Sequence, residues 1–140
     1  MRTNWPTGPS TRVSAGVPPA GELGRDLQNM LARWSDDAWL AHSPAARWPA
    51  LAAVESGPRR AQALRRLVEE VLKEALATAD EDGTRALRAV EKAYLARARS
   101  HSTAASELGV SRATFYRLLP RGVALLAERL RHELIHRREF

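Results

Sequence analysis

The sequence predicts an all-α protein in which a helical bundle follows an extended N-terminal tail. Ala, Leu, Arg and Glu dominate the 140 residues, and aromatic residues make up only 6%, a balance that favours helices. Apolar residues recur at spacings of three and four in several segments, and no segment alternates as a strand would. The 44% apolar fraction suits one modest core.

The N-terminal part is predicted to be a flexible tail followed by short helices. Residues 1–24 are rich in Pro, Gly, Ser and Thr and show no apolar period, so we expect a disordered or extended tail. From Arg25 to Ser35, apolar residues fall on one helical face. A short piece over 37–42 follows, and Ser43-Pro44 then fits an N-cap with proline at the first helical position.

The longest helix is predicted to open at Pro58 and to end at Gly83. A broad apolar stripe supports it, made of Leu64, Leu67, Val68, Val71, Leu72, Ala75 and Leu76. We expect Gly83 to take the left-handed conformation that commonly ends helices. Thr84 is then placed to cap a further helix that extends to Ser100.

The stretch "STAASELGVSRATFYRLLPRG", Ser102 to Gly122, has the pattern of two short helices joined by a tight turn. Ser102 is expected to cap a helix that ends at Leu108. Gly109 falls where the chain turns with positive φ, which costs least for a residue without a Cβ. Ser111 is expected to cap the second helix, over residues 111–119.

Small and apolar residues are expected to hold these two short helices together. Ala104, Ala105 and Leu108 on the first helix are predicted to face Phe115 and Leu118 on the second, and Ala105 is small because the helices cross closely. Leu119-Pro120 should end the second helix, because proline disfavours helical geometry in the preceding residue. A last amphipathic helix then packs through Leu126, Leu130 and Leu134.

Positive charge is confined to the C-terminal part of the chain. The formal net charge is +6. Residues 84–140 carry twelve Lys and Arg against five Glu, whereas residues 1–83 carry ten basic against eleven acidic side chains. A basic surface on one part of a protein is typical of a module that binds a phosphate backbone. The alternative is a solvated helical surface.

The segment "ELGVSRATFYRLLPRGVALLAERL" resembles region 4 of sigma factors and related regulator domains, which are bacterial helix-turn-helix DNA-binding domains. The resemblance covers roughly residues 84–134. The Tyr116-Arg117 pair is also similar to helix-turn-helix segments that end larger bacterial regulatory proteins. Two features depart from the family: no promoter-melting region 2 precedes the segment, and Leu118 stands where sigma region 4 often has a basic residue. A working sigma factor is therefore not expected.

The resemblance implies that the helix 111–119 enters the DNA major groove. Its outward residues are expected to be Arg112, Ala113, Tyr116 and Arg117, and Arg112 and Arg117 can each bond guanine O6 and N7 together. Contacts to the DNA backbone are expected from a further group of side chains, namely Ser111, Thr114, Tyr116, Arg97, Arg99 and Arg121. Ala113 is placed to touch a thymine methyl group.

A competing motif lies near the C-terminus. His132-Glu133-Leu134-Ile135-His136 fits H-E-x-x-H, in which two histidines bind zinc and the glutamate acts as a base. Its context argues against zinc: only four residues follow the motif, and nothing in the sequence suggests His42 or His101 as the third ligand. The positive charge of four nearby arginines also opposes a divalent cation. No other catalytic set emerges, so we expect no enzyme, no cofactor and no metal site.

These patterns predict a cytoplasmic, sequence-specific DNA-binding protein, a bacterial transcriptional regulator with double-stranded DNA as its partner. Three segments are expected: the tail 1–24, a helical dimerisation or docking module over 25–82, and the helix-turn-helix module over 83–140. The protein is expected to form a homodimer, or to bind a protein partner, through residues 25–80. The alternative is an adaptor that docks on RNA polymerase or a larger signalling protein. With no cysteine and no run of about 18 apolar residues, neither disulfides nor a membrane are expected.

Overall fold

The computed structural model describes residues 16–95 and 100–136, and within these ranges every regular element is helical, which confirms the all-α prediction. The α-helices are α2 (Ala20–Ala32), α3 (Asp37–Ala41), α4 (Pro58–Thr78), α5 (Glu81–Val90), α6 (His101–Leu108) and α7 (Arg112–His136). Two 3-10 turns, η1 (Pro44–Arg47) and η2 (Pro49–Leu51), join α3 to α4, and a π-helical turn, η3 (Glu91–Leu95), extends α5.

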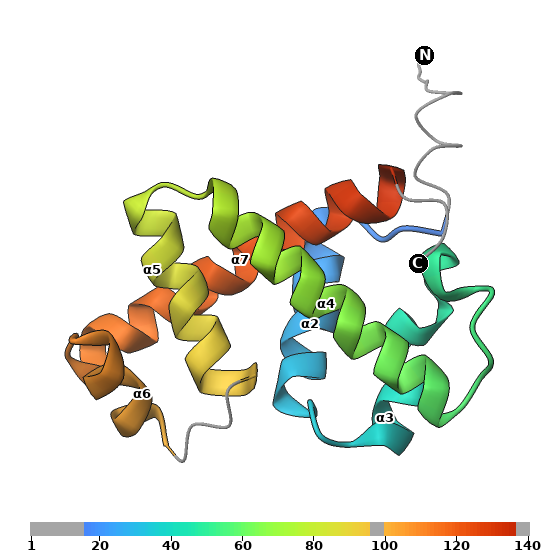
Figure 1. Ribbon diagram of the computed structural model, residues 1–140, viewed down its shortest axis with the longest axis horizontal. Coiled ribbons are helices and arrows are strands. Elements are labelled where there is room, and N and C mark those ends of the chain that lie inside the picture. Colours follow the sequence, from blue (N-terminus) through green and yellow to red (C-terminus); the bar gives the residue numbers. More distant parts are fainter. Residues whose placement is uncertain (1–15, 96–99, 137–140) are drawn as a thin grey trace.

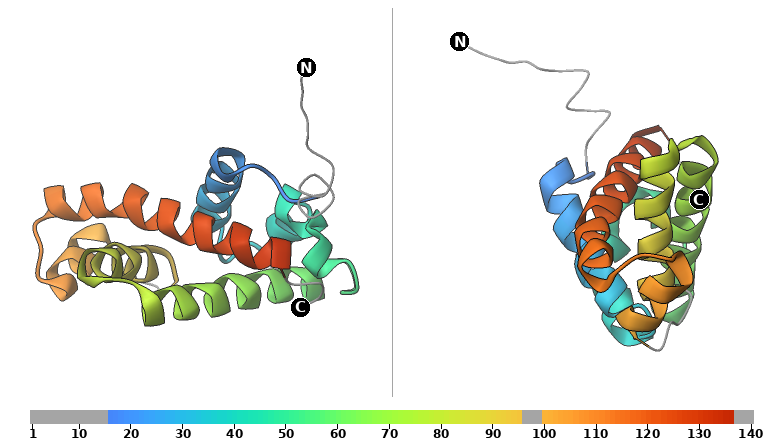
Figure 2. Two further views of the ribbon diagram at one scale, coloured as in Figure 1. Left: turned by 90° about the horizontal axis from the view of Figure 1, so that it is seen from above. Right: turned by 90° about the vertical axis from the view of Figure 1, so that its left-hand side faces the viewer.

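The two long helices, α4 and α7, run side by side in opposite directions along the long axis of the molecule (Figure 1). Helix α7 lies between α2 on one side and α4 and α5 on the other (Figure 2). The helices α5 and α6 and the first turns of α7 form one end of the molecule, and α3, η1 and η2 form the other (Figure 1).

One hydrophobic core runs through both predicted modules. Leu27, Leu64, Leu87 and Leu126 are all at most 1% exposed and belong to a single cluster of buried side chains. Because α7 packs on α2 and α4 as well as on α5, the segments 25–82 and 83–140 are not packed as separate bodies. Whether residues 25–80 bind a second chain stays a prediction.

The predicted tail boundary was wrong by several residues. Helix α2 begins at Ala20 rather than at Arg25, and Leu23 is fully buried, as is most of Val17. Leu23 stands four residues before Leu27 and so extends the same apolar face. Gly21 and Gly24 hid this pattern, because glycine is a poor helix former. Residues 1–15 lie outside the described residues.

The turn between α4 and α5 also differs from its prediction. Gly83 does not end the longer helix; it lies buried within α5. Asp80 caps α5 instead of Thr84, since its carboxylate accepts a hydrogen bond from the Gly83 backbone N–H at 2.7 Å. An Asp followed by two further acidic residues is a favourable helix start, because these charges face the positive end of the helix dipole.

Helix α7, with 25 residues, is the longest described helix, and Pro120 does not end it. The prediction of a helix confined to 111–119 was therefore wrong. Pro120 is exposed to solvent, so water can reach the Tyr116 carbonyl that the missing N–H leaves free. The buried residues of α7 continue at helical spacing beyond Pro120; they are Phe115, Leu119, Gly122, Val123, Leu126, Ala127, Leu130 and Leu134.

Gly122 brings α5 and α7 into close contact directly after the proline. A Cβ built at Gly122 would lie 2.2 Å from the Ala86 carbonyl oxygen and 2.6 Å from Val90 Cγ2. The absence of a side chain therefore allows the two helix backbones to approach. This contact lies two residues after Pro120, so α7 packs closely against α5 directly beyond the proline.

Candidate nucleic-acid interface

Helix α6, the turn after it and the start of α7 form the predicted helix-turn-helix. The cap of α6 is Ser100 rather than Ser102, because Ser100 Oγ accepts a hydrogen bond from the Thr103 backbone N–H at 3.1 Å. Gly109 has φ +72°, which confirms the predicted left-handed turn. The Val110 N–H donates to the Ala105 carbonyl, which is a helix-ending pattern that a glycine in this conformation permits.

The side chains beneath the turn pack largely as the sequence predicts. Ala104, Ala105 and Phe115 are buried, and Leu108 and Leu118 are half-buried against the same core. Phe115 is fully buried, so it anchors the first turn of α7. Helices α6 and α7 contact each other, and both alanines are buried.

The opposite side of the first turns of α7 is open to solvent. The exposed residues Arg112, Ala113, Tyr116, Arg117 and Arg121 spread over about half of the circumference of the helix, and we call them the arginine face. Tyr116 is 46% exposed, the largest value for a bulky hydrophobic side chain among the described residues. The arginine face lies at the end of the molecule formed by α5 and α6, away from α3 (Figure 1). Arg97 and Arg99 lie outside the described residues.

A short chain of hydrogen bonds holds the start of the arginine face in place. Ser111 Oγ accepts a hydrogen bond from the Thr114 N–H at 3.1 Å, which confirms its predicted role as a cap. The Ser111 hydroxyl also donates to Thr114 Oγ1 at 3.1 Å, and Arg117 Nη2 donates to the same Thr114 oxygen at 3.2 Å. Thr114 thus positions the guanidinium of Arg117. It is half-buried, so it lies at the edge of the face.

The arginine face is positively charged, and no acidic residue lies near it in the sequence of α7. No acidic residue occurs from Arg112 to Ala127. Among the described residues, neither Arg112 nor Arg121 forms an ion pair. The one acidic residue of α6, Glu107, pairs with Lys92 at 3.0 Å, so its charge is balanced. Arg112 also stands at the positive end of the α7 dipole, where an anion is favoured.

His101 is a structural residue of this region that the sequence indicated only as a third zinc ligand. Its ring lies between aromatic rings of other elements, with centroids 5.7 Å from Phe115, 5.5 Å from Tyr116 and 6.3 Å from Tyr94. Tyr94 in turn accepts a hydrogen bond from Gln28 of α2 at 3.0 Å. The aromatic contacts connect the first residue of α6 to the arginine face, and no short sequence pattern predicts them.

The H-E-x-x-H residues lie at the far end of α7. The rings of His132 and His136 have centroids 4.4 Å apart, and the Glu133 carboxylate lies 3.6 Å from Arg129 Nε. The part of the chain that the structure describes holds no group of three or more side chains placed to bind a metal ion. His42 and His101 lie in α3's C-cap and at the start of α6 and do not join the motif.

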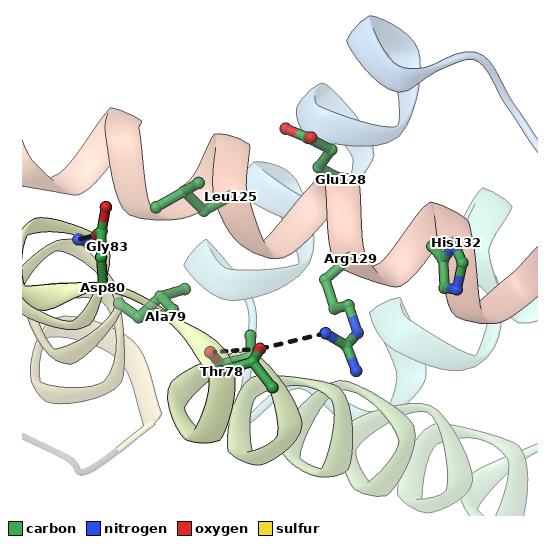
Figure 3. A pocket seen from close by; sticks show the side chains of 10 residues that line it. Thr78, Ala79, Asp80, Gly83, Leu125, Glu128, Arg129 and His132 are labelled. Atoms are coloured by element: carbon green, nitrogen blue, oxygen red, sulfur yellow. Dashed lines mark hydrogen bonds between the residues drawn. The ribbon is translucent and has the colours of Figure 1, made fainter.

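A cleft of about 650 Å³ lies between α4, α5 and α7, with His132 at one edge (Figure 3). Arg129 crosses it and donates a long hydrogen bond, 3.4 Å, to the Thr78 hydroxyl. Asp80 and Glu128 line the same cleft, so its charge is mixed. The α7 residues that line it lie between Leu125 and His132, further along the helix than the arginine face.

Comparison of the chain with protein-family models, curated proteins and solved structures finds no match. Within residues 16–95 and 100–136, no helix has the length and apolar character needed to cross a bilayer. The site is therefore interpreted from its own residues.

Proposed function

We propose that this protein binds double-stranded DNA through the arginine face, with the first turns of α7 in the major groove and α6 across the backbone. The observation that carries the proposal is the exposure of Arg112, Arg117 and Arg121 in the first turns of α7, a segment that holds no carboxylate. A guanidinium binds phosphate and the guanine edge with matched geometry. The anchoring of this face by Phe115 and the Gly109 turn supports a helix-turn-helix reader.

The hydrogen bond from Arg117 to Thr114 favours a specific role for Arg117. A guanidinium that is already oriented loses less conformational freedom on binding than a free one. We therefore assign Arg117 to base reading, with Arg112 beside it, and Arg121 to the phosphate backbone. In this assignment the protein is a regulator of transcription, and binding rather than catalysis is its activity.

The test is recovery of genomic DNA fragments by the purified protein, followed by affinity measurements on the recovered site and on random DNA. Arg117→Ala should weaken binding to the recovered site about 10- to 100-fold and reduce its preference over random DNA. Arg121→Ala should weaken both alike and lower the salt dependence by about one unit of log–log slope. Equal losses of preference in the two variants would contradict the assignment.

Arg59→Ala is the matched control for the loss of one positive charge. Arg59 is exposed in the first turn of α4, at the other end of the molecule, and its pair with Glu55 is exposed as well. Its removal should change DNA affinity less than about twofold, because such pairs contribute little and the site lies far from the arginine face. If no fragment is enriched and Arg117→Ala behaves as Arg59→Ala does, the protein is not a DNA reader. The adaptor alternative would then take its place.

A further inference from the structure

A groove of about 490 Å³ runs between the first half of α2 and the middle of α7, and small or apolar residues line most of it. These residues are Ala20, Gly21 and Gly24 from α2 and Val123, Ala124 and Ala127 from α7. The groove begins at Pro120, one helical turn beyond Arg117 on the same helix. It is thus distinct from the arginine face but held rigidly to it.

Among the described residues, nothing requires a glycine at either of the two glycine positions of the groove. Neither has a positive φ, and a Cβ at Gly21 or Gly24 would meet nothing within 4 Å. Gly122 differs, because its Cβ would collide with α5. A glycine inside a helix costs about 1 kcal/mol relative to alanine. Glycine at such a position is explained when another backbone approaches from outside.

The two rims of the groove carry charges of opposite sign, and these two charged residues do not form an ion pair with each other within one chain. Arg25 stands on the α2 side and Glu128 on the α7 side, and both are exposed. Neither forms an ion pair with another described residue. The neighbouring Asp26 has a pKa above its ordinary value, mainly because of its burial and also because of the nearby Glu22 carboxylate. The charge of Arg25 lowers this pKa by a smaller amount.

We propose that this groove is the contact surface between two copies of the chain, related by a two-fold axis. In such a dimer the same surface of both copies forms the contact. Arg25 of each copy then lies against Glu128 of the other copy, so the dimer holds two such ion pairs. A two-fold pair therefore uses both rims and covers the glycines of both copies. The choice of a second copy also rests on the proposed function, since a single helix-turn-helix contacts few base pairs and a dimer reads two half-sites.

The test is the molar mass of the full chain without DNA, from sedimentation equilibrium between about 1 μM and 1 mM. The wild type should reach about 31 kDa, twice the 15.5 kDa of one chain. Arg25→Glu and Glu128→Arg should each raise the dimer dissociation constant about tenfold or more, because each places like charges opposite one another. The double reversal should restore the wild-type value, which a merely structural role of either residue would not produce.

Gly24→Gln is a second, independent variant that fills the groove. The fold should tolerate it, since nothing lies within 4 Å of that position, and circular dichroism would verify this. The dimer should be lost. Arg59→Glu, at the other end of the molecule, is the control and should leave the mass unchanged.

A wild type that stays monomeric at every concentration overturns the proposal. A groove filled instead by residues 1–15 of the same chain would give that monomer. The proposal is also overturned if either single charge reversal, Arg25→Glu or Glu128→Arg, leaves the dimer intact. It is overturned as well if the double variant does not restore the dimer. Because the mass is measured without DNA, a dimer that fails to bind DNA would contradict only the proposed function, and a monomer that binds DNA only the dimer.

Discussion

The two parts of α7 before and after Pro120 use one helix in different ways. From Arg112 to Leu119, two of eight side chains, Phe115 and Leu119, are buried, and the arginines face solvent. From Gly122 to Leu134, buried residues recur at every turn and pack against α2, α4 and α5. The later part fixes the helix in the core, so the earlier part can present charge without supplying much of the packing itself.

The exposure of the arginine face therefore depends on packing elsewhere in the same helix. A separate short helix over 111–119 would be held by few contacts, namely Phe115, Leu118, Leu119 and the turn at Gly109. A continuous helix is held along its whole length. The arginines therefore keep a fixed orientation relative to the groove between α2 and α7.

The largest loss of stability is expected at Phe115, which anchors the first turns of α7. Phe115→Ala should lower the free energy of unfolding by about 3–5 kcal/mol, because the side chain is fully buried and leaves a cavity. Tyr116→Ala, the next residue and exposed, should cost less than about 1 kcal/mol. Urea unfolding monitored by circular dichroism measures both; similar losses would show that the first turns of α7 are not anchored as described.

A smaller effect should come from Gly122, at the start of the packed part. Gly122→Ala places a methyl group against the Ala86 carbonyl and Val90, and should cost about 1–3 kcal/mol despite the better helix propensity of alanine. Gly24→Ala, on an open face, should instead leave stability unchanged or raise it by up to about 1 kcal/mol. Thermal and urea unfolding would compare the pair, and a stabilising Gly122→Ala would refute the close approach of α5 and α7.

The smallest loss of stability is expected at Ser111, where different substitutions separate an effect on the fold from an effect on DNA binding. Ser111→Ala should cost about 1 kcal/mol, because it removes the cap and the partner of Thr114. Ser111→Asn and Ser111→Asp should both retain the cap. Ser111→Asp should nevertheless bind DNA more weakly than Ser111→Asn, because only the aspartate puts a negative charge beside Arg112. Equal DNA binding by the two would contradict a phosphate near this helix end.

Local patterns predicted the helix-turn-helix better than the elements around it. The Gly109 turn, the Ser111 cap and the burial of Ala105 and Phe115 were confirmed. The exposure of Arg112 and Arg117 followed from the same helical period. The roles of His101 and of Thr114 as a support for Arg117 were not predictable, because they depend on ring and hydroxyl positions that spacing does not fix.

Local sequence patterns are enough to predict the helical class, the turn at Gly109 and the capped start of α7. These depend on steric limits of φ and on hydrogen bonds between residues three positions apart, which neighbours in the chain decide. Only the tertiary structure decided that Pro120 lies within one long helix, that Leu23 extends α2 into the core and that Gly83 is buried. Each of these depends on which distant helix packs there, and the gain from burial against that helix outweighs the local preference of a proline or a glycine.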